Sequence, residues 1–354
     1  MRKYLLLAGL FLIPSLLLSG CRPGQGSSQS GHASQARTVQ HFRQLGYDVQ
    51  SEAAGINASG QVVGTGVTND HLAHAFLWTP SSGFCELGSL SGRSSVARGI
   101  NASGQVVGST NTPEKHSHAF LWTAEKGMQD LGTLGGNESY AEAINDAGQV
   151  VGKAMTKDNI FHAFLWTADK GMQDLGTLFD GKGASDAHQI NTAGQVVGTA
   201  SAPPNGSDHA FLWSATTGMQ DIGAGEALAI NDAGQVTGGE ITRRKTHKGY
   251  CAYLWSASSG LQDIGPTDCL SSTAKCLNAH GQVLVESAYD QRISTVCWTS
   301  AGMTELGTLG GQPYCAAAAI NEAGQVVGSA NAADGKPHAF IWSASTGMHD
   351  LNEY

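Results

Sequence analysis

The chain has 354 residues and a formal net charge of −9 at pH 7, and 47 of its residues are glycine. The acidic balance argues against a nucleic-acid partner, because nucleic-acid-binding proteins present a basic face to the phosphates. Glycine at about 13% of the chain, against a usual ~7%, together with few charged residues, indicates many tight turns rather than long helices.

The first twenty residues have the pattern of an export signal. Arg2 and Lys3 precede an apolar run over residues 5–18, which is too short to cross ~30 Å of membrane hydrocarbon as a helix. The run ends in Leu-Ser-Gly-Cys at Cys21, which resembles the lipobox of bacterial lipoproteins. That resemblance implies that Cys21 is acylated and becomes the mature N-terminus. Ordinary cleavage near Gly20 and an uncleaved segment are the alternatives.

A polar segment over residues 22–37, rich in Gly, Ser and Gln, follows the cysteine. As a flexible tether it would span roughly 20–24 Å, enough to hold a domain clear of the lipid headgroups. We therefore expect a signal peptide at 1–20, a lipidated cysteine and tether at 21–37, and a repeat domain at 38–354. The lipoprotein resemblance implies a cell-envelope location; Arg22 after the cysteine favours the outer membrane in a Gram-negative host, facing the periplasm or the surface.

Two motifs recur in register along the remaining chain. One is Ile-Asn-x-x-Gly-Gln-Val-Val-Gly, as in INASGQVVG from Ile56, and the other is HAFLW, as at residues 162–166. They define seven units, and each unit holds one of the seven tryptophans. The repeated asparagines are Asn57, Asn101, Asn145, Asn191, Asn231, Asn278 and Asn321.

Each unit reads, in chain order, as four short strands. A strand such as residues 95–100 runs into an Asn-x-x-Gly turn, where the Asn side chain bonds its own backbone and the Gly supplies positive φ. Gln-Val-Val-Gly returns as an antiparallel partner, HAFLW forms the third strand, and MQDLGTL, as at residues 128–134, forms the fourth.

Such a unit cannot bury both faces of its sheet alone, so its neighbours must stack on it. Four-stranded sheets repeated around an axis form a β-propeller, usually with about four to eight blades. We therefore expect an all-β, seven-bladed propeller of four-stranded antiparallel blades. In the third strand, Ala75 and Leu77 should face one neighbour and Phe76 the other, with Trp78 packed between sheets.

The ends of the chain suggest how the ring closes. Residues 42–46 (FRQLG) resemble the fourth strand but precede the first unit, and the last unit also ends in such a strand at residues 348–351. We hypothesise that one terminal copy completes a blade begun at the other end. Deleting residues 38–47 should then lower the melting temperature markedly.

HAFLW, INxxGQVVG and DLGTLGG together resemble the HAF repeat of predicted extracellular bacterial proteins. The likeness covers nearly the whole chain after the tether and implies a secreted, propeller-like protein, without implying an activity. The fifth unit departs from the pattern with CAYLW, and the sixth departs with STVCW and with Val285 in the place of a glycine.

A histidine stands four residues before the tryptophan in five units. Equivalent residues of different blades lie too far apart to share one metal ion at ~2.0–2.1 Å, so we expect each histidine to hydrogen-bond a neighbouring strand or turn. The NDAG turns carry too few carboxylates for calcium. We predict no metal, no cofactor and no catalytic motif. The five histidines are His74, His118, His162, His209 and His338.

Six cysteines remain after Cys21, which in an exported chain permits either disulfides or free thiols. Cys269 and Cys276 flank one connecting loop and are the first candidate pair. The least repetitive polar stretch, TRRKTHKG, lies between the second and third strands of the fifth unit. It could contact an anionic glycan, a lipid headgroup or an acidic partner, or be a solvated loop. Its candidate contact residues are Arg243, Arg244, Lys245, His247 and Lys248.

We expect a lipid-anchored cell-envelope propeller that acts as a binding or scaffolding module for a protein or glycan partner, by analogy with other propellers. The alternative is an envelope enzyme, a glycan-processing hydrolase or lyase, with a carboxylate site at the propeller channel. Acidic residues that break the repeat would then have to converge there, for example Glu138, Asp180, Asp186 or Glu226.

Overall fold

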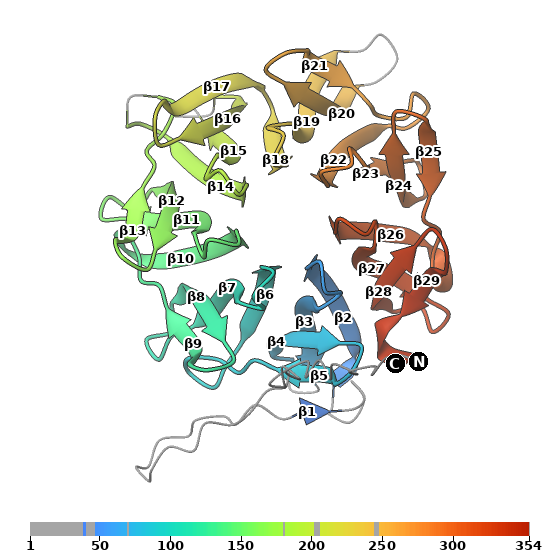
Figure 1. Cartoon of the computed structure of the whole chain (residues 1–354), viewed down its shortest axis with the longest axis horizontal. Coiled ribbons are helices and arrows are strands. Elements are labelled where there is room, and N and C mark those ends of the chain that lie inside the picture. The colour runs from blue at the N-terminus through green and yellow to red at the C-terminus, as the bar shows by residue number, and fades with distance from the viewer. Residues whose placement is uncertain are drawn as a thin grey trace, which may run out of the picture.

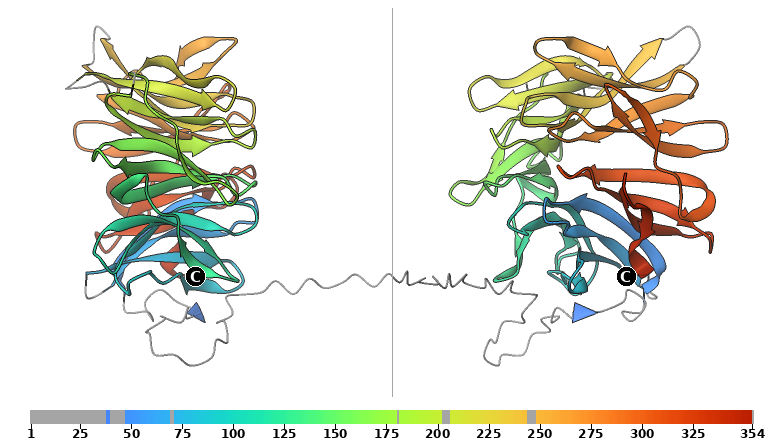
Figure 2. Two further views of the ribbon diagram at one scale, coloured as in Figure 1. Left: turned by 90° about the vertical axis from the view of Figure 1, so that its left-hand side faces the viewer. Right: turned by 45° about the vertical axis from the view of Figure 1, so that its right-hand side comes forward.

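The computed structural model describes residues 38–39, 47–68, 71–179, 181–201, 206–243 and 248–353. Within these ranges the chain is all-β apart from one short 3-10 helix, η2 (Leu351–Glu353). Figure 1 shows the strands in groups of four around a common axis, with the first strand of each group innermost and the fourth outermost. The side views show a flat, disc-like molecule (Figure 2).

The strands follow the sequence repeats. The first unit is β2 (Tyr47–Ile56), β3 (Val62–Thr68), β4 (Ala73–Thr79) and β5 (Gly83–Glu86), with β1 (Thr38–Val39) beside β5. The second is β6 (Ser95–Ile100), β7 (Val106–Asn111), β8 (Ser117–Thr123) and β9 (Gly127–Asp130), and the third is β10 (Gly135–Ile144), β11 (Val150–Thr156), β12 (Phe161–Thr167) and β13 (Gly171–Asp174).

The remaining units repeat this arrangement. The fourth is β14 (Ala184–Ile190), β15 (Val196–Ser201), β16 (Asp208–Ser214) and β17 (Gly218–Ala224), and the fifth is β18 (Glu226–Ile230), β19 (Val236–Arg243), β20 (Lys248–Ser256) and β21 (Gly260–Asp263). The sixth is β22 (Ser271–Leu277), β23 (Val283–Ala288), β24 (Ile293–Thr299) and β25 (Gly302–Glu305), and the last is β26 (Gly310–Ile320), β27 (Val326–Ala332), β28 (Pro337–Ser343) and β29 (Gly347–Asp350).

Continuous hydrogen bonding divides these strands into six sheets. One sheet has eight strands because the last two units share a single parallel pair, Ile293 with Tyr314. Within each unit the strands pair in sequence order and antiparallel. The expected all-β propeller of four-stranded antiparallel units is confirmed, whereas the continuous sheets number six rather than seven.

The Asn-x-x-Gly turns form as expected. Asn101 Oδ1 accepts a hydrogen bond from the backbone N of Gln105 at 3.0 Å, and Gly104 has a φ of 75°. In addition, each Asn Nδ2 donates to the carbonyl oxygen of the corresponding Asn in the next unit. Seven such bonds, 3.0–3.2 Å long, form a closed circle that the sequence patterns did not predict.

The hydrophobic cores lie between adjacent units rather than within one. Phe76 and Trp78 pack in a core shared by the first and last units, while Ala75 and Leu77, on the opposite face of β4, pack against the second unit. The predicted alternation of the third strand, and the packing of its tryptophan between sheets, are confirmed. Each unit therefore supplies half of the apolar interface with each of its neighbours.

The second strand holds a glycine because the aromatic ring of the third strand crosses it. Gly64 pairs with Phe76, and a Cβ on this glycine would lie 2.7 Å from the phenylalanine ring and 2.0 Å from the carbonyl oxygen of Glu52. In the sixth unit this pair is replaced by Val285 and Val296, which also lie opposite each other. The two departures of the sixth unit therefore compensate each other, because two valines take the place of a glycine and a phenylalanine.

The described strands show no exchange between the two ends of the chain. β1 pairs with β5 of the first unit, and β29 pairs with β28 of the last unit. Residues 42–46, which prompted the closure hypothesis, lie outside the described residues, so that hypothesis stays a prediction. Within the described residues the junction is made by side chains, such as Ser51 Oγ, which accepts from the backbone N of Ala339 at 3.1 Å.

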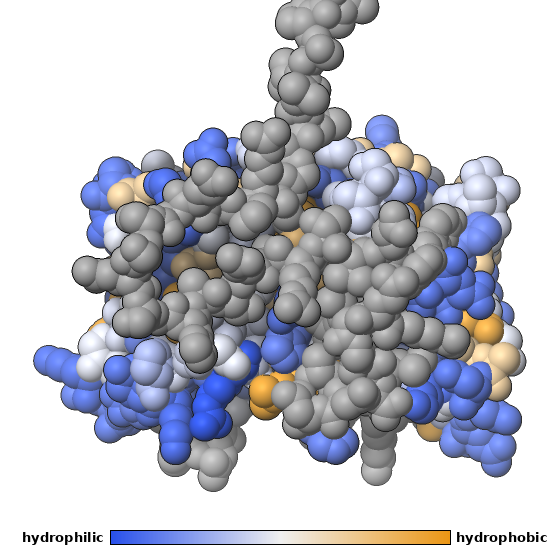
Figure 3. Space-filling view, turned by 90° about the horizontal axis from the view of Figure 1, so that it is seen from below, coloured by the Kyte–Doolittle hydropathy of each residue, from blue (hydrophilic) through white to orange (hydrophobic). Residues whose placement is uncertain are grey.

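No helix in the described ranges has the length and apolar character needed to span a membrane. Figure 3 views the rim from below, and its described residues are mostly hydrophilic, with scattered hydrophobic side chains between them. Such scattered apolar residues are usual for a surface in contact with water.

Candidate functional site

Every inner strand contains a β-bulge at the same place. The register with the second strand shifts directly after a buried alanine, as between Ala97 and Gly99, so the residue in between has no cross-strand partner. The same shift occurs in all seven inner strands. Bulges turn a side chain away from the pleat and are common beside functional sites. Here they present one residue from each unit to the axis.

These seven bulge residues line one central cavity of about 550 Å³. Six residue types occur at this position, which carries Ala54, Arg98, Glu142, His188, Leu228, Lys275 and Ala318. The four polar ones were not predicted from the sequence. Variation between the repeats does not mark them, because the position two residues earlier, that of Glu52 and Val96, varies as much.

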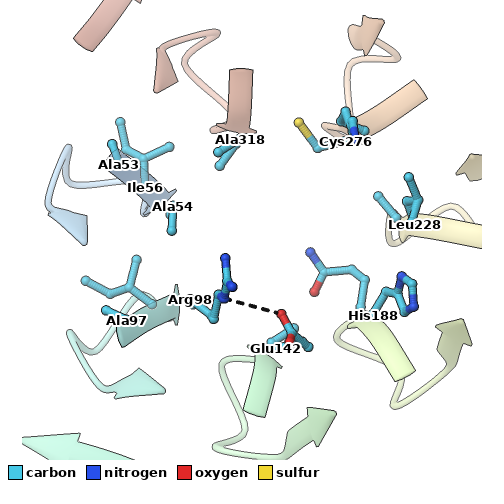
Figure 4. A pocket seen from close by; sticks show the side chains of 18 of the residues that line it. Ala53, Ala54, Ile56, Ala97, Arg98, Glu142, His188, Leu228, Cys276 and Ala318 are labelled. Atoms are coloured by element: carbon cyan, nitrogen blue, oxygen red, sulfur yellow. Dashed lines mark ion pairs between the residues drawn. The ribbon is translucent and has the colours of Figure 1, made fainter. Parts of the chain in front are cut away.

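Arg98 and Glu142 form the ion pair seen in Figure 4, with Arg98 Nε 3.8 Å from Glu142 Oε2. The Arg98 side chain points into the cavity and is 52% exposed, whereas Glu142 is 31% exposed. Burial raises the pKa of Glu142, and the charge of Arg98 only partly opposes this effect. The pair therefore holds a carboxylate in surroundings that disfavour its charged form.

A second cation, Lys275, lines the cavity from the sixth unit, and its Nζ lies 3.6 Å from Glu286. Glu52, on the first inner strand, lines the same cavity and is exposed. Among the described residues, no ion-pair or hydrogen-bond partner of the Glu52 carboxylate is present. An adjoining cavity of about 440 Å³ is lined by Glu52, Arg98, Glu142, Lys275 and Glu286 together.

A side cavity of about 350 Å³ opens at the fourth inner strand, between Lys153, Asp186, His188 and Glu226. Lys153 Nζ donates to Asp186 Oδ2 at 2.6 Å. Burial alone would lower the pKa of Lys153, but the hydrogen bond and charge of Asp186 outweigh it and raise that pKa. Burial lowers the pKa of His188 and, together with the charge of Asp208, raises the pKa of Glu226.

Two of the four acidic residues proposed for an enzymatic site converge, since Asp186 and Glu226 both line this side cavity. Glu138 instead accepts a hydrogen bond from the hydroxyl of Tyr140 at 3.0 Å and lines neither the central nor the side cavity. Asp180 lies outside the described residues.

The recurring histidines have the expected structural role. Each one hydrogen-bonds through Nδ1 to a carboxylate of the fourth strand, as His162 does with Asp174 at 2.9 Å. The other four pairs are His74 with Glu86, His118 with Asp130, His209 with Asp221 and His338 with Asp350. Among the described residues, no group of three or more His, Cys, Asp and Glu side chains is placed to hold a metal ion.

The acidic turn residues also have a structural use. Asp146 Oδ1 accepts from the backbone N of Ala102 at 2.8 Å, and Asp232 Oδ1 accepts from the backbone N of Thr192 at 3.0 Å. Each NDAG turn thus caps the turn of the preceding unit.

The predicted pair Cys269–Cys276 is wrong, because both thiols are free. Cys269 donates to the carbonyl oxygen of Pro266 at 3.2 Å, whereas Cys276 lies near the end of β22. At about 3.3 Å per residue, that strand places the two Cα atoms on the order of 20 Å apart, well beyond the ~4.4–6.8 Å of a disulfide. Burial raises the pKa of Cys276 to about 12.

The predicted contact loop is described only at its base, where Arg243 of β19 pairs with Lys248 of β20. Residues 244–247, which include Arg244, Lys245 and His247, lie outside the described residues. The loop therefore stays a prediction.

No protein-family model matches this chain, and no curated protein matches it in sequence. Solved structures do resemble it. The β-propeller domain of the trilobed protease from Pyrococcus furiosus, which has an open velcro topology, matches with a TM-score of 0.57 at 10% identity, over 86% of this chain and 96% of that domain.

Two further solved structures resemble the chain with similar TM-scores and identities. A puromycin-hydrolyzing peptidase of Mycobacterium tuberculosis matches with a TM-score of 0.60 at 10% identity over 86% of this chain, which spans only 52% of the peptidase. The BP39L lectin from Burkholderia pseudomallei matches with a TM-score of 0.52 at 10% identity, over 86% of this chain and 99% of the lectin. At such identities the likeness shows the fold alone, and the chain is similar to β-propellers found in both peptidases and lectins.

Proposed function

We propose that this chain is a lipid-anchored binding module of the cell envelope, for a protein or glycan partner, with its binding site at the central cavity. The observation that carries the proposal is the set of seven β-bulges, which direct seven residues of six types into one cavity. The framework of each unit repeats, while the residue directed at the axis changes.

A purely structural axis would need only small side chains, such as Ala54 and Ala318. Arg98, Glu142 and Lys275 instead place charges where part of their hydration is lost, and the raised pKa of Glu142 reflects that cost. Charged groups in unfavourable surroundings inside a cavity are typical of binding and catalytic sites. The arrangement therefore supports ligand binding as the use of this cavity.

The anchor is proposed from the lipobox-like sequence at Cys21. Replacing Cys21 with Ser should prevent acylation, so the variant should no longer incorporate labelled palmitate and should leave the membrane fraction. A variant that still fractionates with membranes and carries lipid label would contradict the anchor.

The binding role can be tested with the full chain in detergent, by affinity capture from envelope extract and on a glycan array. A ligand or partner that is retained by the wild type should be lost in Arg98→Gln and Lys275→Gln. Arg93→Gln and Lys126→Gln, which change the same residue types at exposed sites, should retain it. A partner that binds all four variants equally would contradict a site in the cavity.

A second candidate, a glycan-processing enzyme, is favoured by one observation. Asp186 and Glu226 line the same side cavity in different surroundings, since Lys153 pairs with Asp186 and burial raises the pKa of Glu226. Glycan hydrolysis uses one protonated and one ionised carboxyl group. Release of reducing ends from envelope glycans that disappears in both Asp186→Asn and Glu226→Gln would support this role, and activity that survives both changes would oppose it.

A further inference from the structure

We propose that the central cavity binds a small zwitterion, a molecule with both a carboxylate and an ammonium group, through Arg98 and Glu52. This inference rests on the proposed binding site at the central cavity and goes beyond the protein or glycan partner to a small molecule that the cavity would hold.

Arg98 supplies the group for the carboxylate. Its Nε faces Glu142 at 3.8 Å, and no partner of its two terminal nitrogens is present among the described residues. The side chain points into the cavity from the second inner strand (Figure 4). A guanidinium offers parallel N–H donors whose spacing matches a carboxylate, so these two nitrogens form a ready bidentate site.

Lys275 strengthens the attraction for a carboxylate from another side. It belongs to the sixth unit, yet it lines the same cavity as Arg98 of the second. Its ammonium lies 3.6 Å from Glu286, longer than a hydrogen bond, and its side chain is 37% exposed. The lysine can therefore turn toward a bound anion at little cost.

Glu52 supplies the group for the ammonium. It lies on the first inner strand, next to the unit of Arg98, and lines both central cavities. Arg98 pairs through Nε with Glu142 and not with Glu52. The Glu52 carboxylate and the two terminal nitrogens of Arg98 therefore do not neutralise each other. A ligand with both charges would satisfy both groups.

The charges of the lining favour a ligand that carries both signs. The central cavity is lined by two carboxylates, Glu52 and Glu142, and by two cations, Arg98 and Lys275. A purely anionic ligand would leave the Glu52 carboxylate unpaired, and a purely cationic one would leave the terminal nitrogens of Arg98 unpaired. A zwitterion adds no net charge and pairs with each sign separately.

The rest of the lining sets the size of the ligand. Ala54, Leu228 and Ala318 add apolar surface, and His188 and Gln189 add polar groups. A volume of about 550 Å³ falls within the range of small-molecule sites. A molecule such as a free amino acid or a dipeptide fits this description.

The test compares three dipeptide probes of one size by calorimetry on the full chain in detergent. Alanyl-glycine has both charges, N-acetyl-alanyl-glycine lacks the ammonium, and alanyl-glycinamide lacks the carboxylate. We expect alanyl-glycine to bind and each blocked analogue to bind at least about tenfold more weakly, because each leaves one charged group of the protein unpaired.

The variants assign each charge to its residue. Arg98→Gln should lose most of the preference for alanyl-glycine over alanyl-glycinamide, and adding Lys275→Gln should remove the remainder. Glu52→Gln should bind alanyl-glycine and its N-acetyl form equally. Arg93→Gln and Glu114→Gln, at exposed sites outside the cavity, should keep the full discrimination. Melting temperatures equal to that of the wild type will show that the variants are folded.

Two outcomes would overturn the inference: no binding of alanyl-glycine at millimolar concentration, or binding of all three probes with one affinity. If a glycan or protein partner is then still captured and lost in Arg98→Gln, the binding function stands and only the zwitterion is wrong. If no partner is captured either, both fail together.

Discussion

Asn321 donates through Nδ2 to the backbone carbonyl oxygen of Asn57 at 3.1 Å, across 264 residues of sequence. This bond is the one that closes the circle of asparagines, because the other six link consecutive units. In an open row, the last Asn amide and the first carbonyl would have no such partner. Closure of the ring gives both groups this partner.

Replacing Asn321 with Ala should lower the free energy of unfolding by about 1–3 kcal/mol, because it removes the side-chain bond to the carbonyl of Asn57 and two bonds to Gln325 within its own turn. The loss should exceed that of Asn145→Ala, whose two units remain joined by the chain. Denaturant unfolding measures both. Asn137→Ala, at an exposed site, is the control, and equal losses for Asn321→Ala and Asn145→Ala would contradict a special role in closure.

Replacing Ser51 with Ala should weaken the same junction between the first and last units. Ser51 is 1% exposed and accepts from the amide of Ala339, so the change leaves a buried N–H without a partner, which costs about 1–3 kcal/mol. Hydrogen exchange at the Ala339 amide should become faster. The matched change, Ser95→Ala, removes the equivalent bond to Ala75 between the first and second units. Exchange at Ala339 that speeds up equally in both variants would show general loosening rather than a local opening.

The parts of the fold that depend on short sequence patterns were predictable. The Asn turn, the pleat of the third strand and the histidine hydrogen bond each follow from residues a few positions apart or on paired strands. The circle of asparagine hydrogen bonds was not, because its bonds between consecutive units span 40 to 47 residues and depend on how neighbouring units stack.

The candidate site was missed for a different reason. Shared letters revealed the repeat, but Arg98, Glu142 and Lys275 stand where the units differ. A bulge is a shift of register between two strands, so no local composition marks it. Val285 and Val296 are another example. The sequence marks both as departures from the repeat, but only the register of β23 with β24 shows that they lie opposite each other.

That pairing predicts an interaction between two substitutions. Val296→Phe alone should cost about 1–3 kcal/mol, since Val285 occupies the space that a glycine leaves in other units. Val285→Gly alone should also destabilise by leaving a void. Together they restore the common pair, so the double variant should be more stable than the sum of the single effects. Urea unfolding of the four proteins gives the coupling, and simple additivity would contradict this account.

His188 should make the stability of the protein depend on pH. Burial lowers its pKa from 6.5, and the positive charge of Lys153 adds to this, while Asp186 opposes it. As the pH falls below 6.5, the unfolded chain binds a proton that the folded state resists, so the free energy of unfolding falls until the pH passes the folded-state pKa. His188→Gln should therefore reduce the loss of stability between about pH 7 and pH 5. A slope unaltered by His188→Gln would show that this histidine is protonated equally in both states.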